Sequence, residues 1–230
     1  MWDYVHAAAT AGVGLVAVAV TGSAIAKPIA ETAFSTFIPS PYSRRAKEFD
    51  RAVADVFTRH EHRLHNVEAT PERVDTLLDV HFAARFAATG TSAPEKFEAL
   101  RNAVLNAAIG ADIGSASADI LTSLLQRLTP IHLRVLTILG DADAKFAEAG
   151  QAPRVRSQPQ GLINLLLRAF PQWNAASEDI DVALRDLERD TLIRTDGSKM
   201  IYVDEVGKFR ELITPFGRKL LKFISEPAAE

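Results

Sequence analysis

Two complete helix signals lie between residues 70 and 110, in the sequence TPERVDTLLDVHFAARFAATGTSAPEKFEALRNAVLNAAIG. The first opens with Thr70 and Pro71 and ends at Gly90, and the second opens at Pro94 and ends at Gly110. A capping residue or proline at the start and a glycine after the last apolar position are the usual boundaries of an α-helix. The sequence therefore predicts two helices joined by a short connection.

Apolar residues in both segments recur at the three- and four-residue spacing that places them on one face of a helix. The first segment carries Val74, Leu77, Leu78 and Phe82, and the second carries Phe97, Leu100, Val104, Leu105 and Ala108. Three further segments, starting near Ser43, Ser115 and Thr129, repeat the pattern. Their apolar-face positions are Phe49, Val53, Val56, Phe57, His60, Leu64 and Val67, then Ile120, Leu121, Leu124, Leu125 and Leu128, then Leu133, Leu136 and Leu139. We expect these faces to point inward and to form a helical bundle.

The pattern changes in the last third of the chain, after a stretch rich in Gly, Pro, Gln and Ala. The expected elements are a helix at 161–170, a helix at 177–190, strands at 192–194 and 200–203 around a turn at 196–198, and a closing helix after the sequence TPFG at 214–217. This order is that of a winged-helix module, for which residues 130–140 can supply the first helix.

The predicted fold class is mainly α: a helical bundle followed by a winged-helix-like (α+β) module, with an apolar N-terminal helix in front. The domains are placed at 1–38 (apolar Ala/Gly-rich N-terminal segment), 43–140 (helical bundle), 141–160 (linker) and 161–225 (winged-helix-like module).

The N-terminal segment contains twenty residues without a charge, from Ala7 to Ala26, which is the length of a membrane span. Aromatic side chains at one end and a lysine at the other are typical interfacial anchors, and small residues allow close packing between helices. The residues expected to serve membrane contact or self-association are Trp2, Tyr4, Ala8, Ala11, Gly12, Val16 and Lys27. Three interpretations remain open: a membrane-associated segment, which we favour, a helix buried in protein or in an oligomer, and a signal peptide.

The helix expected at 177–190 is acidic, with six carboxylates against two arginines and hence a net charge of −4. In a winged-helix protein this helix usually enters the DNA major groove, and a negative surface repels phosphate. The wing offers possible contacts at Arg194, Lys199, Lys208 and Arg210, but carboxylates are interleaved with them. We therefore favour a protein partner over nucleic acid.

The sequence carries no motif of a catalytic or cofactor site, so we expect no enzyme activity, no cofactor and no bound metal. The chain has no cysteine among its 230 residues, and its net charge is −3. His60, His62 and His65 lack the spacing of metal ligands, so a solvated helix surface is the preferred interpretation. His132 is expected to be a partly buried partner of a neighbouring side chain.

Four sequence stretches resemble the landmarks of a broad family of uncharacterised bacterial proteins. They are PSPYSRR at 39–45, EKFEALRNAVLN at 95–106, LTPIHLRVL at 128–136 and TPFG at 214–217. This resemblance implies family membership but no activity. A looser resemblance to abortive-infection components implies a role in antiviral defence.

Two functions are consistent with these observations. The first is a non-enzymatic effector or interaction protein in the bacterial cytoplasm, associated with the inner membrane, able to self-associate and acting in antiphage or stress response. The second is a soluble winged-helix DNA-binding transcriptional regulator. The apolar N-terminus favours the first, and the expected order of elements in the last third favours the second.

Overall fold

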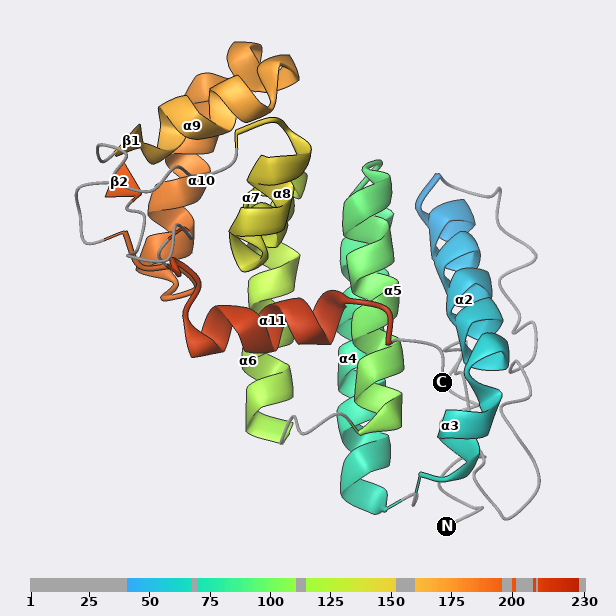
Figure 1. Ribbon diagram of the computed structural model, residues 1–230. Helices are drawn as coiled ribbons and strands as arrows, with labels where there is room; N and C mark the ends of the chain where they lie inside the picture. The colour runs from blue at the N-terminus through green and yellow to red at the C-terminus, as the bar shows by residue number, and fades with distance from the viewer. Residues whose placement is uncertain are drawn as a thin grey trace. The chain divides into compact units, whose positions relative to one another are not determined.

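Helices make up most of the described chain, as the computed structural model in Figure 1 shows. The structure describes residues 41–67, 70–110, 115–151, 160–195, 200–201, 209 and 211–227. The mainly helical class predicted from the sequence is therefore confirmed. The described residues form two compact units: unit 1 comprises the residues up to Arg127 together with Phe223 and those after it, and unit 2 comprises Leu128–Lys222.

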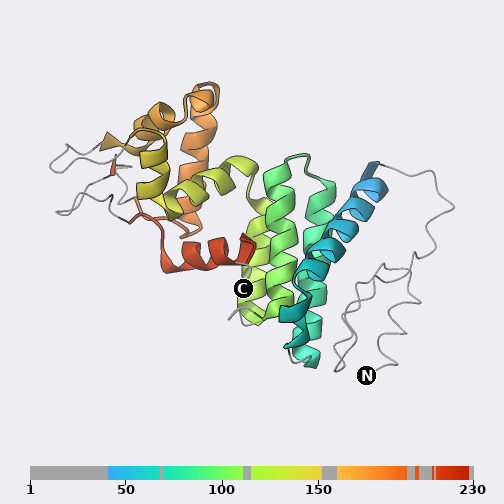
Figure 2. The ribbon, with the colours of Figure 1, turned by 45° about the vertical axis from the view of Figure 1, so that its right-hand side comes forward.

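Unit 1 is a helical bundle. Its helices are α2 (Pro41–Arg59), α3 (Glu61–His65), α4 (Pro71–Thr89), α5 (Pro94–Ile109) and α6 (Ser115–Arg127). The longer helices lie side by side in Figures 1 and 2, and α4 contacts α2, α5 and α6. Thr70 caps α4 by accepting the backbone N–H of Arg73, and Gly110 ends α5 with a φ of 73°. The predicted boundaries of these two helices are confirmed.

The core of unit 1 is built from the predicted apolar faces. Its fully buried large side chains include Phe49, Phe57, Leu100, Leu105, Leu121 and Leu125. Burying one such side chain stabilises the fold by roughly 1.5–3 kcal/mol. Polar contacts fix α2 antiparallel to α4, because Arg45 donates to the carbonyl of Thr89 at 3.2 Å while Asp50, further along α2, accepts from Arg85 at 2.9 Å.

Some predicted positions in unit 1 were wrong. Phe82 and Ile120 were expected inward but are 38% and 55% exposed. The helix expected from Ser43 begins at Pro41 and is interrupted at His60, so that α2 and α3 replace one long helix. The error at Phe82 has a physical cause: apolar residues occur all round α4, so their spacing does not identify the buried face. That face consists of Val80, His81, Ala84 and Ala88.

Unit 2 contains shorter elements. They are α7 (Pro130–Gly140), α8 (Ala142–Glu148), β1 (Gln160–Gly161), α9 (Leu162–Ala169), the 3₁₀ helix η1 (Pro171–Ala176), α10 (Ser177–Arg189), β2 (Met200–Ile201) and the first residues of α11 (Pro215–Ile224). The stretch expected as a linker therefore contains a helix, α8, whose Phe146 is fully buried. Because α10 packs on α7 and α9, these helices share an apolar core.

Strand pairing in the described part of unit 2 differs from the expected hairpin. Gln160 pairs with Ile201 and Gly161 with Met200 in an antiparallel arrangement, and Ile193 forms an isolated bridge with Ile213. The expected turn at 196–198 and residues 202–203 lie outside the described residues. The wing itself therefore stays a prediction.

The sequence TPFG at 214–217 starts α11. Thr214 accepts the backbone N–H of Gly217 at 2.9 Å, which caps the helix, and its hydroxyl donates to the carbonyl of Thr191 at 2.6 Å. A Cβ atom on Gly217 would overlap the carbonyl oxygen of Leu192. Thr214 and Gly217 thus bring the start of α11 against the segment that follows α10.

None of the helices in the described ranges is long and apolar enough to cross a membrane. The apolar segment 1–38 lies outside the described residues. Its association with a membrane therefore stays a prediction.

Candidate functional site

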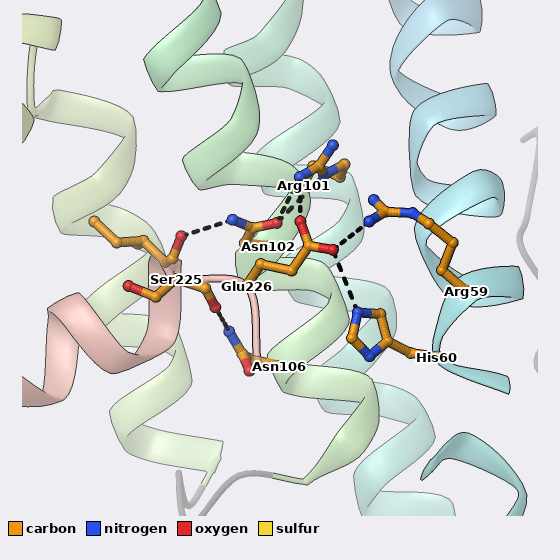
Figure 3. Close-up of polar contacts among 8 residues, drawn as sticks. Arg59, His60, Arg101, Asn102, Asn106, Ser225 and Glu226 are labelled. Atoms are coloured by element: carbon orange, nitrogen blue, oxygen red, sulfur yellow. Dashed lines mark hydrogen bonds and ion pairs between the residues drawn. The ribbon is translucent and has the colours of Figure 1, made fainter. Parts of the chain in front are cut away.

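A cluster of polar side chains in unit 1 holds residues 223–226 (Figure 3). We call it the carboxylate anchor; its members are Arg59, His60, Arg101, Asn102, Asn106 and Glu226. Glu226 accepts hydrogen bonds from Arg59 and from Arg101 Nη2, the latter at 3.0 Å, and its Oε1 lies 3.3 Å from His60 Nε2. Arg59 ends α2 and Arg101 lies within α5, so one carboxylate links two helices of the bundle.

Two asparagines of the anchor donate their amide N–H groups to backbone carbonyls. Asn102 donates to the carbonyl of Ile224 at 3.0 Å, and Asn106 donates to those of Phe223 and Ser225, both at 2.8 Å. The last carbonyls of a helix have no partner within it, and a buried polar group without a partner costs about 1–3 kcal/mol. The amides of Asn102 and Asn106 therefore satisfy the C-terminal end of α11.

The charges of the anchor favour the ionised form of Glu226. Burial acts to raise the pKa of its carboxyl group, but the hydrogen bond from His60 and the charges of Arg59 and Arg101 outweigh burial and lower the pKa from its ordinary value of 4.5. Glu226 is thus a carboxylate at neutral pH. Chemically, the anchor is a carboxylate-binding site whose ligand belongs to the same chain.

The interpretation of the histidine cluster as a solvated surface was wrong for His60. Its ring is only 7% exposed and faces Glu226, whereas His62 and His65 are exposed. The signal that identifies His60 is its position in the apolar stripe between Phe49 and Leu64, since a polar residue in such a stripe is buried and needs a partner. The spacing of histidines alone does not reveal it.

The two asparagines of α5 were not identified from the sequence. Asn102 and Asn106 are four residues apart, so they lie on one face of a helix. Asparagine is unfavourable within a helix because its amide competes for backbone groups, and two on one buried face indicate a backbone segment to bind. This signal predicts that a segment is bound there but does not tell which one.

In unit 2, His132 is buried between a threonine and an aspartate; the sequence predicted a partly buried side chain with a neighbouring partner. His132 Nδ1 accepts the backbone N–H of Thr129 at 3.2 Å and lies 2.6 Å from the Thr129 hydroxyl, and Nε2 lies 3.4 Å from Asp186. The row of contacts Thr129–His132–Asp186 resembles a nucleophile–base–acid triad. However, the Nδ1 lone pair of His132 already accepts a hydrogen bond from the backbone N–H of Thr129. We interpret the group as a cap for α7, with His132 in the role that Glu or Gln has in a capping box.

The exposed face of α10 is acidic, and ion pairs within the helix neutralise its arginines. Arg185 pairs with Asp181 at 3.1 Å and Arg189 with Asp186 at 3.0 Å. Glu178 and Asp179 are exposed in the first turn, and the apolar Val182, one turn further, is 44% exposed. The face thus presents carboxylates beside an exposed valine.

Most site residues expected from the sequence lie outside the described residues. These are Trp2, Tyr4, Ala8, Ala11, Gly12, Val16, Lys27, Lys199, Lys208 and Arg210. Arg194 is described and exposed, and its backbone N–H donates to the carbonyl of Leu212 at 2.7 Å. Of the four expected wing contacts, the structure describes Arg194 alone, so their grouping stays a prediction. No protein-family model, curated protein or solved structure matches the chain.

Proposed function

We propose that this protein is a non-enzymatic, membrane-associated effector or interaction protein of bacterial antiphage or stress response. In this proposal the N-terminal segment attaches the chain to the membrane, and α10 of unit 2 binds a protein partner. The defence role rests on the resemblance of the sequence to abortive-infection components. Membrane attachment rests on the uncharged length from Ala7 to Ala26.

The observation that carries the choice of a protein partner is the pairing of both arginines of α10 with aspartates of the same helix. A helix that binds DNA gains most of its affinity by neutralising phosphates with free cationic side chains. Arg185 and Arg189 would have to break their ion pairs first, and the neighbouring carboxylates would still repel the phosphates. A partner with basic residues around an apolar pocket fits Val182, Glu178 and Asp179 better.

Unit 2 is proposed to be a winged-helix-like module. In its support, α7, β1, α9, α10, β2 and α11 follow one another in the order of that fold, and the short strand before α9 pairs with a strand after α10. The same order favours the alternative function, a soluble winged-helix regulator that binds DNA. The two functions differ in the sign of charge that the partner must carry.

DNA titration of the full chain at low and moderate salt tests the choice between them. We expect the dissociation constant for random duplex DNA to be larger than about 1 μM at physiological salt, which is the range of non-specific binding. The double variant Glu178→Lys with Asp179→Lys should bind DNA more tightly, whereas the exposed pair Glu98→Lys with Asp119→Lys, with the same change of charge, serves as a control for charge alone. Salt-sensitive binding of the wild type at nanomolar concentrations would instead support the regulator.

Carbonate extraction of membranes from cells that express the tagged chain tests the attachment. We expect the chain in the membrane pellet after extraction. Recovery of the full chain in the soluble fraction, together with unfolding of the chain that lacks residues 1–38, would contradict the proposal, because the segment would then be a core helix.

A further inference from the structure

An apolar line runs along the outer face of α4 in unit 1. Leu78, Phe82 and Phe86 are spaced by four residues, so they lie one above the other on the helix. Phe82 and Phe86 are 38% and 78% exposed, and Leu78 is half-buried. A contiguous line of exposed aromatic side chains often marks a surface that another segment covers. Among the residues that the structure describes, none covers Phe86 or the exposed part of Phe82, so this line can receive a further segment.

The chain itself supplies a segment that matches this line. In the sequence IAETAFSTFI at residues 29–38, the apolar residues are Ile29, Ala30, Ala33, Phe34, Phe37 and Ile38, and the four remaining positions are Glu31, Thr32, Ser35 and Thr36. This alternation of pairs is the pattern of an amphipathic helix with one apolar face. Pro39 follows, and proline is common just after a helix end.

We propose that residues 29–38 form a helix that docks on Leu78, Phe82 and Phe86 of α4 in the same chain. The docking does not depend on the proposed function. The two residues between Ile38 and the start of α2 at Pro41 suffice for a tight connection between antiparallel helices.

The geometry of α2 and α4 gives the docked helix its direction. The contact between Arg45 and Thr89 places the start of α2 beside the end of α4, only one turn from Phe86. A helix that turns back from Pro41 runs antiparallel to α2 and hence parallel to α4. Ten residues of helix span about 15 Å, and the line from Leu78 to Phe86 spans about 12 Å. Phe37 and Phe34 then lie near Phe86 and Phe82.

Three kinds of occupant fit this apolar line, and we propose the local segment. A second copy of the chain or a lipid surface would also cover exposed aromatic residues. The local segment is favoured because it is already tethered at the end of the patch, so that its effective concentration is far above that of any separate partner. Its consequence for the proposed function is that the uncharged stretch Ala7–Ala26 would be joined to unit 1 through a docked helix.

Cross-linking tests the proposal, because the chain has no cysteine and every introduced thiol is unique. The pair Ala30→Cys with Asp79→Cys joins the far end of the proposed helix to an exposed position of α4 beside Phe82. A short bis-maleimide reagent should link this pair within one chain of the purified full-length protein. The matched pair Ala30→Cys with Glu98→Cys, on the exposed face of α5, should not be linked.

A second measurement checks that the aromatic line itself is covered. The thiol of Phe86→Cys should react with a soluble maleimide about tenfold more slowly in the full chain than in a chain lacking residues 1–38, which corresponds to about 1.4 kcal/mol of docking free energy. Removal of residues 1–26 alone should leave the reaction slow.

Links between two chains would assign the patch to a second copy. Equal reactivity of Phe86→Cys in the full and shortened chains would overturn the docking, and protection that appears only with lipid vesicles would assign the patch to a lipid surface.

Discussion

Replacing Glu226 with glutamine tests whether the carboxylate anchor stabilises unit 1. The substitution removes the charge but keeps the size of the side chain and one acceptor oxygen. It leaves the guanidinium of Arg101, 18% exposed, and the ring of His60, 7% exposed, without their carboxylate. Arg59 is 54% exposed, so solvent screens its share of the interaction.

These exposures set the magnitude of the loss. A hydrogen bond to a charged group contributes about 1.5–3 kcal/mol when buried, and an exposed ion pair about 0.2–1 kcal/mol. Because Glu226 is itself 33% exposed and glutamine still accepts one hydrogen bond, the values for the two buried partners are reduced. We expect Glu226→Gln to lower the free energy of unfolding by about 1–2 kcal/mol at about pH 7.

The pH dependence gives a second, independent signature. The pKa of Glu226 in the folded chain lies below its ordinary value of 4.5, so its contribution to stability is complete above that value. As the pH falls through the folded pKa, the wild-type carboxylate takes up a proton and the contribution is lost. The stability difference between the wild type and Glu226→Gln should therefore shrink toward zero in acid.

Urea unfolding followed by far-ultraviolet circular dichroism measures this difference, with Asp119→Asn on α6 as a control for the loss of one exposed negative charge. The double variant Glu226→Gln with Arg101→Gln should cost less than the sum of the single variants, because both remove the same contact. Equal stability of Glu226→Gln and the wild type at about pH 7, or a difference that persists in acid, would refute the anchor as an electrostatic contact.

Three further predictions concern single residues. Gly217→Ala should lower stability by about 1–3 kcal/mol in thermal unfolding, because the added Cβ overlaps the carbonyl of Leu192, while the unobstructed Gly90→Ala should change stability by less than about 1 kcal/mol. Thr191→Gly should raise stability by about 0.5–1 kcal/mol in the same assay, because Thr191 has a φ of 57° that a β-branched residue adopts only with strain. Val16→Asp should release the full chain from membranes in carbonate extraction, since a carboxylate within a span costs about 2.5–3.5 kcal/mol.

The sequence predicted helix boundaries well where a proline or a glycine marks them. Pro71, Pro94 and Pro130 each stand at the first position of a helix, and Gly90 and Gly110 follow helix ends. These residues act through their own backbone, so their effect does not depend on the rest of the fold. This explains why the mainly helical class and most of the helices of unit 1 were correct.

The sequence predicted buried faces less well where a helix has several neighbours. α4 packs against α2, α5 and α6, and apolar residues occur all round it. Spacing then gives no preferred direction, so Phe82 was placed inward although it is 38% exposed. The same holds in unit 2 for the stretch 141–160, whose composition indicated a linker although Phe146 in α8 is fully buried.

The carboxylate anchor could not be predicted because its partners are far apart in sequence and half of its bonds to residues 223–226 go to backbone. Asn102 and Asn106 bind the carbonyls of Phe223, Ile224 and Ser225. A carbonyl is the same in every residue, so these bonds place no demand on the side chains at positions 223–225. Only the carboxylate of Glu226 has to match the cationic groups that face it. Recognition of the side chain at position 226 thus depends on the cationic groups around it, whereas the carbonyls at the end of α11 depend on Asn102 and Asn106 of α5. Arg101 couples the two parts, because it donates to both Asn102 and Glu226.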